Sequence, residues 1–214
     1  MEKIKRWNII AVMVGIISVL LCIILVMNLD RMFVVPEIAL PAGIDQYDLS
    51  IISNSRNGTT PGAQVIIEEF LDFGCSFCSS SQKTVERVML VYGKNVNVII
   101  RHLPHSSQSM HAAEASECAR DQGLFWSYHN ILLENQIRLS ETDLFLHAQT
   151  LGVDMDAFRK CMDSREKIAV IESDRKYANE KVVTATPTFI INGWMIKGAK
   201  EYSDFKKIID SELD

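Results

Sequence analysis

The sequence predicts an α/β domain whose sheet is interrupted by a helical insertion and is preceded by a transmembrane helix. Three observations support this fold class. Residues 7–29 form an apolar stretch, and strand and helix patterns alternate over residues 64–105. A purely helical pattern over residues 106–181 then separates these elements from the strands and final helix of residues 182–214.

The apolar stretch 7–29 carries no charged side chain. Its core, from Ile9 to Met27, is 19 residues long. At ~1.5 Å per residue, a helix of that length spans about 28 Å, close to the hydrocarbon core of a bilayer. The stretch ends in "MNLDRMFVVPE", without the small-x-small site of a cleaved signal peptide. We therefore predict an uncleaved signal anchor over residues 1–30, with a cleaved signal peptide and a buried soluble helix as the alternatives.

The charges around this stretch predict its orientation. The basic residues ahead of it are Lys3, Lys5 and Arg6. The positive-inside rule then places the N-terminus in the cytoplasm. Everything after Asp30 is expected on the extracytoplasmic side of the cytoplasmic membrane, in the periplasm or outside the cell.

The formal net charge of the chain is −5, and it becomes −6 when residues 1–30, with three basic and two acidic side chains, are set aside. Nucleic-acid binding needs a basic face, so a nucleic-acid partner is not expected. Residues 31–63 are rich in proline, glycine and other turn formers, which predicts a stalk or linker.

A βαβ unit is predicted directly after the stalk. Residues 64–73 are rich in Val, Ile and Phe and indicate a buried strand. Apolar residues recur at helical spacing over 77–92, and Gly93 can end that helix. Residues 95–103 alternate as a second strand. Two strands joined by a helix of this length form a right-handed crossover, so 64–105 is the first half of the sheet domain.

The remaining residues predict the insertion and the return to the sheet. Within 106–181 the pattern is helical throughout, and Ser140 with Asp143 resembles a capping box at the start of one helix. Asn192-Gly193 lies between two apolar runs, which is typical of a two-residue hairpin turn. An amphipathic helix closes the second half of the sheet domain, residues 182–214.

Cys75 and Cys78 lie in the turn between the first strand and its helix. Open α/β sheets place their sites at this end of a strand. The helix N-terminus stabilises a thiolate on Cys75, and Cys78, one turn further along, can attack a mixed disulfide formed there. A zinc site would need two more ligands, and His102 and His105 follow at a spacing that fits zinc fingers poorly. A purely structural bridge would close too small a loop to stabilise much, so a redox centre without a metal is the prediction.

Glu69 lies six residues before Cys75, on the strand that feeds this turn. Buried carboxylates are uncommon unless they have a task. We expect Glu69 to relay the proton of Cys78, with a pKa raised by desolvation. The alternative is that Glu68 and Glu69 form a solvated strand end.

Three stretches together resemble the thioredoxin superfamily, in particular its membrane-anchored or secreted DsbA-like bacterial branch. They are "EEFLDFGCSFC", the helical "AAEASECARDQGLFWSYHNILLE" with "FRKCMDS", and "ATPTFIING". The resemblance covers about residues 60–212. It implies a thioredoxin-like fold with an inserted helical domain, Cys75 as nucleophile, Cys78 as resolving cysteine, Glu69 as buried acid and Pro187 as a cis-proline facing the cysteines.

The resemblance also implies a substrate-binding region around the two cysteines. Thr186 would offer backbone hydrogen bonds to an extended peptide. Phe77 would grip apolar segments beside the site or pack on the insertion. Ser76 and Phe77 occupy the positions where strong oxidants of this family often carry a proline or histidine. Oxidants and reductants of this fold differ by ~150 mV, so this dipeptide leaves the direction of electron flow open.

Two further cysteines, Cys118 and Cys161, fall in the helical insertion. With Cys75 and Cys78 paired in the redox centre, they form the remaining pair, and an oxidising compartment favours a structural disulfide between them. Two buried free thiols are the alternative. The histidines of "RHLPHSSQSMH", His102, His105 and His111, are expected to be loop or cap residues, with a role near the active site as the alternative.

The resemblance implies a thiol-disulfide oxidoreductase that forms disulfides in exported proteins and needs no cofactor. Its expected substrates are reduced or unfolded exported proteins. A membrane quinone-linked partner of the DsbB kind would reoxidise it, and the N-terminal helix would hold both in one membrane. A disulfide reductase or isomerase of the same fold, and a non-catalytic surface binding protein, are the alternatives.

Overall fold

The computed structural model describes residues 62–214. The predicted stalk up to residue 61 and the predicted transmembrane helix lie outside the described residues. Among the helices of residues 62–214, none combines the length and apolar character needed to cross a bilayer.

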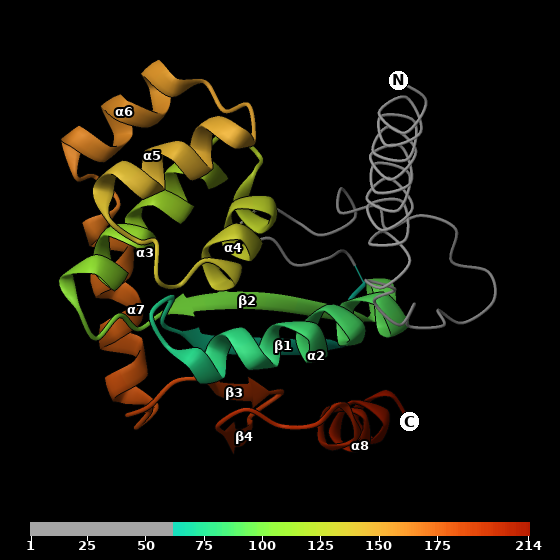
Figure 1. Ribbon diagram of the computed structural model, residues 1–214. Helices are drawn as coiled ribbons and strands as arrows, with labels where there is room; N and C mark the ends of the chain where they lie inside the picture. The colour runs from blue at the N-terminus through green and yellow to red at the C-terminus, as the bar shows by residue number, and fades with distance from the viewer. Residues whose placement is uncertain (1–61) are drawn as a thin grey trace, which may run out of the picture. The chain divides into compact units, whose positions relative to one another are not determined.

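A four-stranded mixed sheet lies at the centre of the described residues, with strand order β2-β1-β3-β4 (Figure 1). The strands are β1 (Val65–Leu71), β2 (Val96–His102), β3 (Thr188–Ile191) and β4 (Trp194–Lys197). β1 pairs in parallel with β2, while β3 runs antiparallel to both β1 and β4. Asn192 and Gly193 join β3 to β4 with φ angles of 45° and 98°, which confirms the predicted two-residue hairpin turn.

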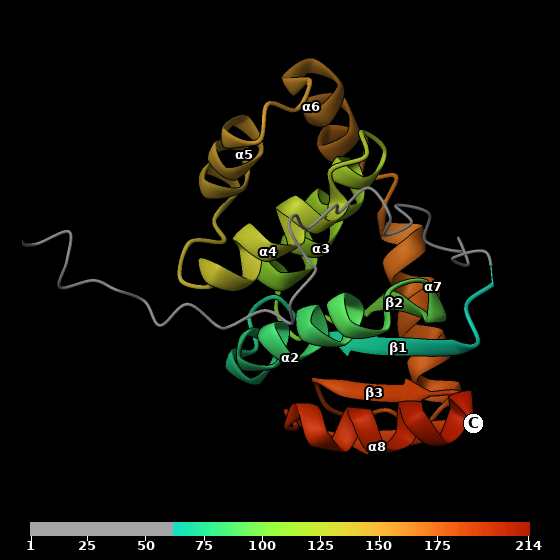
Figure 2. The same ribbon diagram turned by 90° about the vertical axis from the view of Figure 1, so that its right-hand side faces the viewer.

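Helices cover both faces of this sheet. On one face lie α2 (Ser76–Tyr92), which links β1 to β2, and the C-terminal helix α8 (Tyr202–Leu213) (Figure 2). The opposite face packs against α7 (Ile168–Glu180). The predicted α/β order is therefore confirmed, with a sheet buried between two helical layers.

Alternation along β1 decides which of its two glutamates is buried. Successive side chains of a strand point to opposite faces. Val65 and Ile67 belong to the core beneath α2 and α8, whereas Phe70 packs with α7. Glu69 shares the face of Val65 and Ile67, and Glu68 shares that of Phe70. The strand itself therefore directs Glu69 toward the helix that carries the cysteines.

The helices between β2 and β3 are α3 (Ser107–Arg120), α4 (Phe125–Glu134), α5 (Glu141–Thr150), α6 (Met155–Ser164) and α7. Figure 1 shows α3 to α6 grouped above the sheet. The first part of the predicted helical region forms two helices, α3 and α4. It breaks at Gly123, whose φ of 77° lies outside the helical range. The Ser140 side chain accepts a hydrogen bond from the Asp143 N–H, so the predicted cap is present.

Cys118 of α3 and Cys161 of α6 are joined by a disulfide, with their Cα atoms 5.9 Å apart. Close by, the Arg165 guanidinium makes two hydrogen bonds to the buried Glu114 carboxylate, at 2.7 and 2.8 Å. Both contacts tie the later helices of the insertion back to α3.

We expect the double variant Cys118→Ala/Cys161→Ala to lose stability. The bridge closes a loop with a sequence separation of 43 residues. On the chain-entropy account, such a loop contributes about 3–4 kcal/mol to the free energy of unfolding. Urea denaturation of the variant and the wild type, both with the Cys75–Cys78 pair reduced, measures this difference. An unchanged denaturation midpoint would show that the bridge does not constrain the unfolded chain.

Candidate active site

The two cysteines lie where β1 passes into α2. Cys75 is the N-cap residue of α2. The Cys75 N–H donates to the Asp72 carbonyl at 3.0 Å, and the Gly74 N–H donates to the Asp72 carboxylate at 2.7 Å. This tight turn brings Cys75 to the edge of the sheet and leaves Cys78 one helical turn inside.

The two thiols differ in exposure and in chemistry. Cys75 is half-buried, whereas Cys78 has no exposed surface. Burial is the main factor that raises the pKa of the Cys78 thiol far above its ordinary value, and the nearby Glu69 carboxylate adds to this. A substrate sulfur can therefore reach Cys75 but not Cys78.

Glu69 is 2% exposed, on the face of β1 that supports α2. Desolvation raises its pKa from 4.5 to about 8, so at neutral pH this carboxyl mostly holds its proton. Glu68 lies on the other face, 2.7 Å from Arg101 and 2.9 Å from the Tyr177 hydroxyl. The alternative, that Glu69 belongs to a solvated strand end, is therefore wrong, because its side chain is buried.

The segment before β3 completes the site from the far end of the sequence. The Thr186–Pro187 peptide bond is cis. The Cys75 Sγ donates to the Thr186 carbonyl at 3.4 Å, which brings together residues 111 positions apart. Pro187 itself is buried. The structure thus places the predicted cysteines and the Thr-Pro element in one site.

The dipeptide between the cysteines faces outward. Ser76 is exposed, and the Phe77 side chain is 65% exposed at the start of α2. Of the two positions expected for Phe77, the exposed one beside the site is the one observed. A large apolar side chain on the surface next to Cys75 offers a contact for apolar polypeptide.

Two residues of the site were not foreseen from the sequence. Asp72 is 5% exposed, and its carboxylate holds the turn. Gln136, from the loop between α4 and α5, donates its side-chain amide to the carbonyls of Phe73 and Cys75, at 2.7 and 2.8 Å. A short acidic side chain before a turn is a recognisable signal for Asp72, whereas nothing in the sequence links Gln136 to a turn 61 residues away.

The histidines differ in part from the expectation that they are loop or cap residues. His102 ends β2, is completely buried and bonds Glu117 at 2.7 Å. For His102 the expectation of a loop or cap residue was wrong: it lies in the predicted strand 95–103, and an acid from α3 meets its ring in the core. His105 is a loop residue, and its ring nitrogen Nδ1 lies 3.0 Å from the Asp72 carboxylate at the edge of the site.

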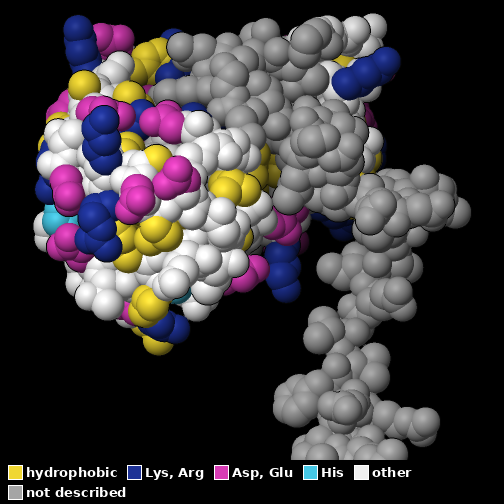
Figure 3. Space-filling model, turned by 90° about the horizontal axis from the view of Figure 1, so that it is seen from above, with side chains coloured by type: hydrophobic (Ala, Val, Ile, Leu, Met, Phe, Trp, Pro, Cys, Tyr) yellow, Lys and Arg dark blue, Asp and Glu magenta, His cyan; other side chains and the backbone are white. Residues whose placement is uncertain are grey.

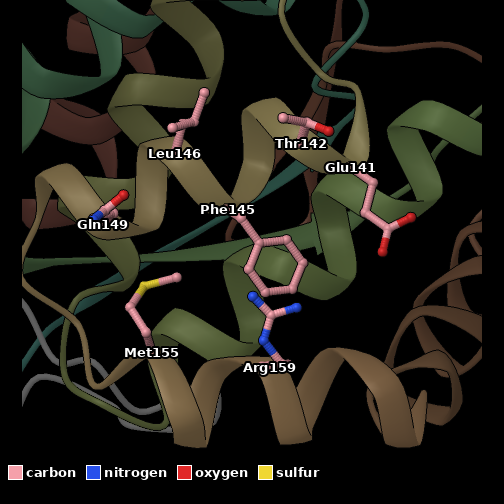
Figure 4. A pocket seen from close by; sticks show the side chains of 7 residues that line it. All are labelled: Glu141, Thr142, Phe145, Leu146, Gln149, Met155 and Arg159. Atoms are coloured by element: carbon pink, nitrogen blue, oxygen red, sulfur yellow. The ribbon is translucent and has the colours of Figure 1, made fainter.

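Two other features of residues 62–214, a surface hollow and a group of acidic and thiol side chains, offer no second redox or metal site. A shallow hollow between α5 and α6 is lined by Phe145, Met155 and Arg159 among others, with no thiol in it (Figure 4). Asp121, Cys161 and Glu166 lie close enough to suggest a metal, but Cys161 is in the disulfide and Lys167 pairs with both acids. On the face in Figure 3, acidic and basic side chains are interspersed.

A sequence model of the family described as thioredoxin matches residues 58–211. This chain belongs to the thioredoxin family. Within it the chain is similar to DsbA-like proteins of known structure, and its helices α3 to α7 interrupt the thioredoxin-like sheet between β2 and β3.

Solved structures with this thioredoxin-like architecture are similar over most of their length. The thiol-disulfide exchange protein α-DsbA2 from Wolbachia pipientis is 25% identical, with a TM-score of 0.65 over 71% of this chain and 83% of that one. A thioredoxin-like oxidoreductase from Silicibacter pomeroyi is 23% identical, with a TM-score of 0.67 over 78% and 98%. Oxidised BdbD from Bacillus subtilis is 24% identical, with a TM-score of 0.62 over 71% and 88%.

Curated relatives of this thioredoxin-family chain include much longer proteins named as Na(+)/H(+) antiporters. It is 37% identical over 135 residues to the Na(+)/H(+) antiporter NhaA 3 of Salinispora tropica, which covers 61% of this chain and 20% of that protein. To the Na(+)/H(+) antiporter NhaA of Herminiimonas arsenicoxydans it is 30% identical, over 70% and 24%. The chain thus spans about a fifth to a quarter of the length of these relatives.

Proposed function

We propose that this protein forms disulfides in exported proteins, as an extracytoplasmic thiol-disulfide oxidoreductase with Cys75-Ser76-Phe77-Cys78 as its redox centre. One observation carries the proposal. A half-exposed Cys75 at a helix N-terminus, with its sulfur 3.4 Å from the Thr186 carbonyl, stands in front of a fully buried Cys78. An accessible sulfur backed by an inaccessible one suits stepwise disulfide exchange.

The first step starts from the Cys75–Cys78 disulfide. A substrate thiolate attacks the Cys75 sulfur, forming a mixed disulfide and releasing Cys78 as a thiolate. Burial makes that thiolate costly, so it must take up a proton. Glu69 still holds a proton at neutral pH and lies on the same side of β1, so it is the proposed donor.

The second step releases the product. A second thiolate of the substrate attacks the substrate sulfur of the mixed disulfide, and Cys75 leaves as a thiolate. The substrate has lost two electrons, and the enzyme holds them as two reduced cysteines. The helix N-terminus stabilises the Cys75 thiolate as the leaving group.

Substrate binding is proposed at the surface around Cys75. The backbone of Thr186 precedes strand β3 beside the sulfur and would bond an extended peptide as an added strand. The exposed Phe77 would contact apolar side chains of the same peptide, and the exposed Ser76 would donate a hydrogen bond. Such contacts favour unfolded, reduced polypeptides as substrates.

Reoxidation is proposed through a membrane quinone-linked partner of the DsbB kind. The apolar stretch 7–29 would anchor the protein in the cytoplasmic membrane, with the redox domain on the extracytoplasmic side. Anchoring would keep the domain and its oxidant in one plane.

The direction of electron flow is tested by the redox equilibrium with glutathione. As an oxidase, the Cys75–Cys78 pair is expected near −120 to −180 mV, the range of strong thiol oxidants. A value near −270 mV, that of thioredoxin, would point away from an oxidase and toward a reductase. Failure of the two cysteines to form a disulfide at any glutathione ratio would point to a non-catalytic binding protein.

A second candidate is the same chemistry directed at a membrane ion transporter. The antiporter matches, at 37% and 30% identity, show relatives in which a similar segment is part of a transporter. A covalent complex between a Cys78→Ser variant and a transporter in native membranes would support this partner. Complexes with exported proteins alone would favour the first candidate.

A further inference from the structure

Two side chains hold the turn that carries Cys75. Asp72 accepts from a backbone N–H group of the turn, and Gln136 donates to two of the turn's backbone carbonyls. Resting on the proposed function, we propose that Gln136 is a positioning residue that sets the reactivity of Cys75, with Asp72 as its counterpart. Neither side chain has a role in the exchange steps above. The proposal makes the helical insertion part of the redox centre.

Gln136 reaches the turn from the loop between α4 and α5. Its Nε2 group donates to two carbonyls of the same turn, Phe73 at 2.7 Å and Cys75 at 2.8 Å. One amide that bridges residues two apart fixes the orientation of the peptide groups between them. The Cys75 carbonyl also accepts from the N–H groups of Cys78 and Ser79, the first bonds of α2. Gln136 therefore bears on the helix N-terminus that stabilises the nucleophile.

Asp72 holds the same turn through its carboxylate. One oxygen accepts from the Gly74 N–H at 2.7 Å. The other accepts from the His105 backbone N–H at 2.9 Å and lies 3.0 Å from His105 Nδ1. His105 leads into α3, so this carboxylate joins the turn to the start of the insertion.

Close packing at Gly74 limits the turn on the side of α3. A Cβ atom at Gly74 would lie 2.7 Å from the Ser109 hydroxyl, closer than atoms can approach. Two parts of the insertion thus contact the turn. The start of the insertion does so through His105 and Ser109, and the middle of the insertion does so through Gln136. Loss of the Gln136 bonds would free one side of the turn and let the N-terminus of α2 shift away from the Cys75 sulfur.

The test compares Gln136→Leu with Gln122→Leu in the full-length protein. Gln122 is a matched control, because it also makes two hydrogen bonds to a neighbouring segment, to the Asp154 N–H and carbonyl, but within the insertion. The first readout is the rate of Cys75 alkylation by iodoacetamide, which requires no redox activity. The second is the equilibrium constant with glutathione.

We expect Gln136→Leu to alkylate at Cys75 about fivefold more slowly and to shift the glutathione equilibrium toward the disulfide by a similar factor, since a hydrogen bond contributes about 1 kcal/mol, or roughly fivefold. Gln122→Leu should keep both wild-type values while losing a similar amount of thermal stability. If Gln136→Leu fails to fold, Gln136→Glu takes its place, because glutamate keeps the length of the side chain but lacks the amide donors. It should show the same slower alkylation and the same shift toward the disulfide.

Wild-type values of both readouts in Gln136→Leu and Gln136→Glu would overturn the proposal and leave Gln136 a structural residue. This result differs from failure of the proposed function. In that case the wild-type pair itself would equilibrate with glutathione as a reductase does, or would form no disulfide at all, whereas the alkylation rates would still separate the variants.

Discussion

Replacement of Cys75 by serine is expected to abolish disulfide exchange, whereas replacement of Cys78 by serine should trap a mixed disulfide with the substrate. Only Cys75 presents its sulfur to the surface, and Cys78 is fully buried. Without Cys75 no substrate sulfur can bond to the enzyme, and the rate should fall on the order of a thousandfold or more, as for loss of other nucleophiles. Without Cys78 no Cys75–Cys78 disulfide exists to oxidise a reduced substrate. The Cys75 thiolate can still attack a disulfide of an oxidised test protein, and the resulting mixed disulfide then has no neighbouring enzyme thiol to resolve it.

Oxidation of a reduced test protein measures the loss of exchange, and incubation of Cys78→Ser with a disulfide-bonded test protein, followed on non-reducing gels, measures the trapping. Cys22→Ser is the matched control, because Cys22 lies in the apolar stretch 7–29 and takes no part in the proposed steps. It should retain wild-type activity. Trapping on Cys78 instead of Cys75, or full activity of Cys75→Ser, would contradict the assigned order of the two sulfurs.

Glu69→Gln is expected to remove a pH dependence of stability between about pH 5 and pH 8. The pKa of Glu69 rises from 4.5 in the unfolded chain to about 8 in the fold. Between these values the folded state binds more protons than the unfolded state, so stability falls as the pH rises. The total loss by pH 8 is on the order of 4 kcal/mol. Glutamine cannot ionise, so the variant should lack this slope.

The same variant should slow the steps that move the proton of Cys78. In the wild type, Glu69 can protonate the leaving Cys78 thiolate below about pH 8, and the variant has no such acid. General acid catalysis of this kind contributes about a hundredfold to the rate, so the exchange rate of the variant should fall by about that factor. Denaturation from pH 5 to 9 and rapid-mixing kinetics measure the two effects. Glu68→Gln is the neighbouring control, since Glu68 bonds Arg101 and Tyr177 on the other face of β1. Equal slopes in both variants would mean that Glu69 is not the group responsible.

Local patterns were sufficient to predict the sheet domain. The Val, Ile and Phe content predicted the first strand and alternation the second. Asn192-Gly193 predicted the hairpin, and the cysteine spacing at a strand–helix turn predicted the redox centre. These features depend on residues close in sequence. The face of Glu69 could also have been read from β1, because Val65 and Ile67 share its parity and belong to the core beneath α2.

Features that depend on contacts distant in sequence could not be predicted in the same way. The amide of Gln136 is a polar group in a loop, and only the folding of α4 against α2 brings it to the Cys75 carbonyl. His102 looked like a loop residue because its partner, Glu117, comes from α3. The break between α3 and α4 depends on Gly123 adopting a positive φ, which a helical pattern does not reveal.

The sequence separation between Cys75 and Thr186 has a consequence for biosynthesis. The two residues meet although 111 positions separate them. A chain is made from its N-terminus, so both reactive cysteines emerge long before β3 can pair with β1. A growing chain therefore carries both thiols before the Thr186 segment exists, and the site around Cys75 is completed only after residue 186 has been added and β3 can pair with β1. The order of the elements along the chain thus separates the appearance of the thiols from the assembly of their surroundings.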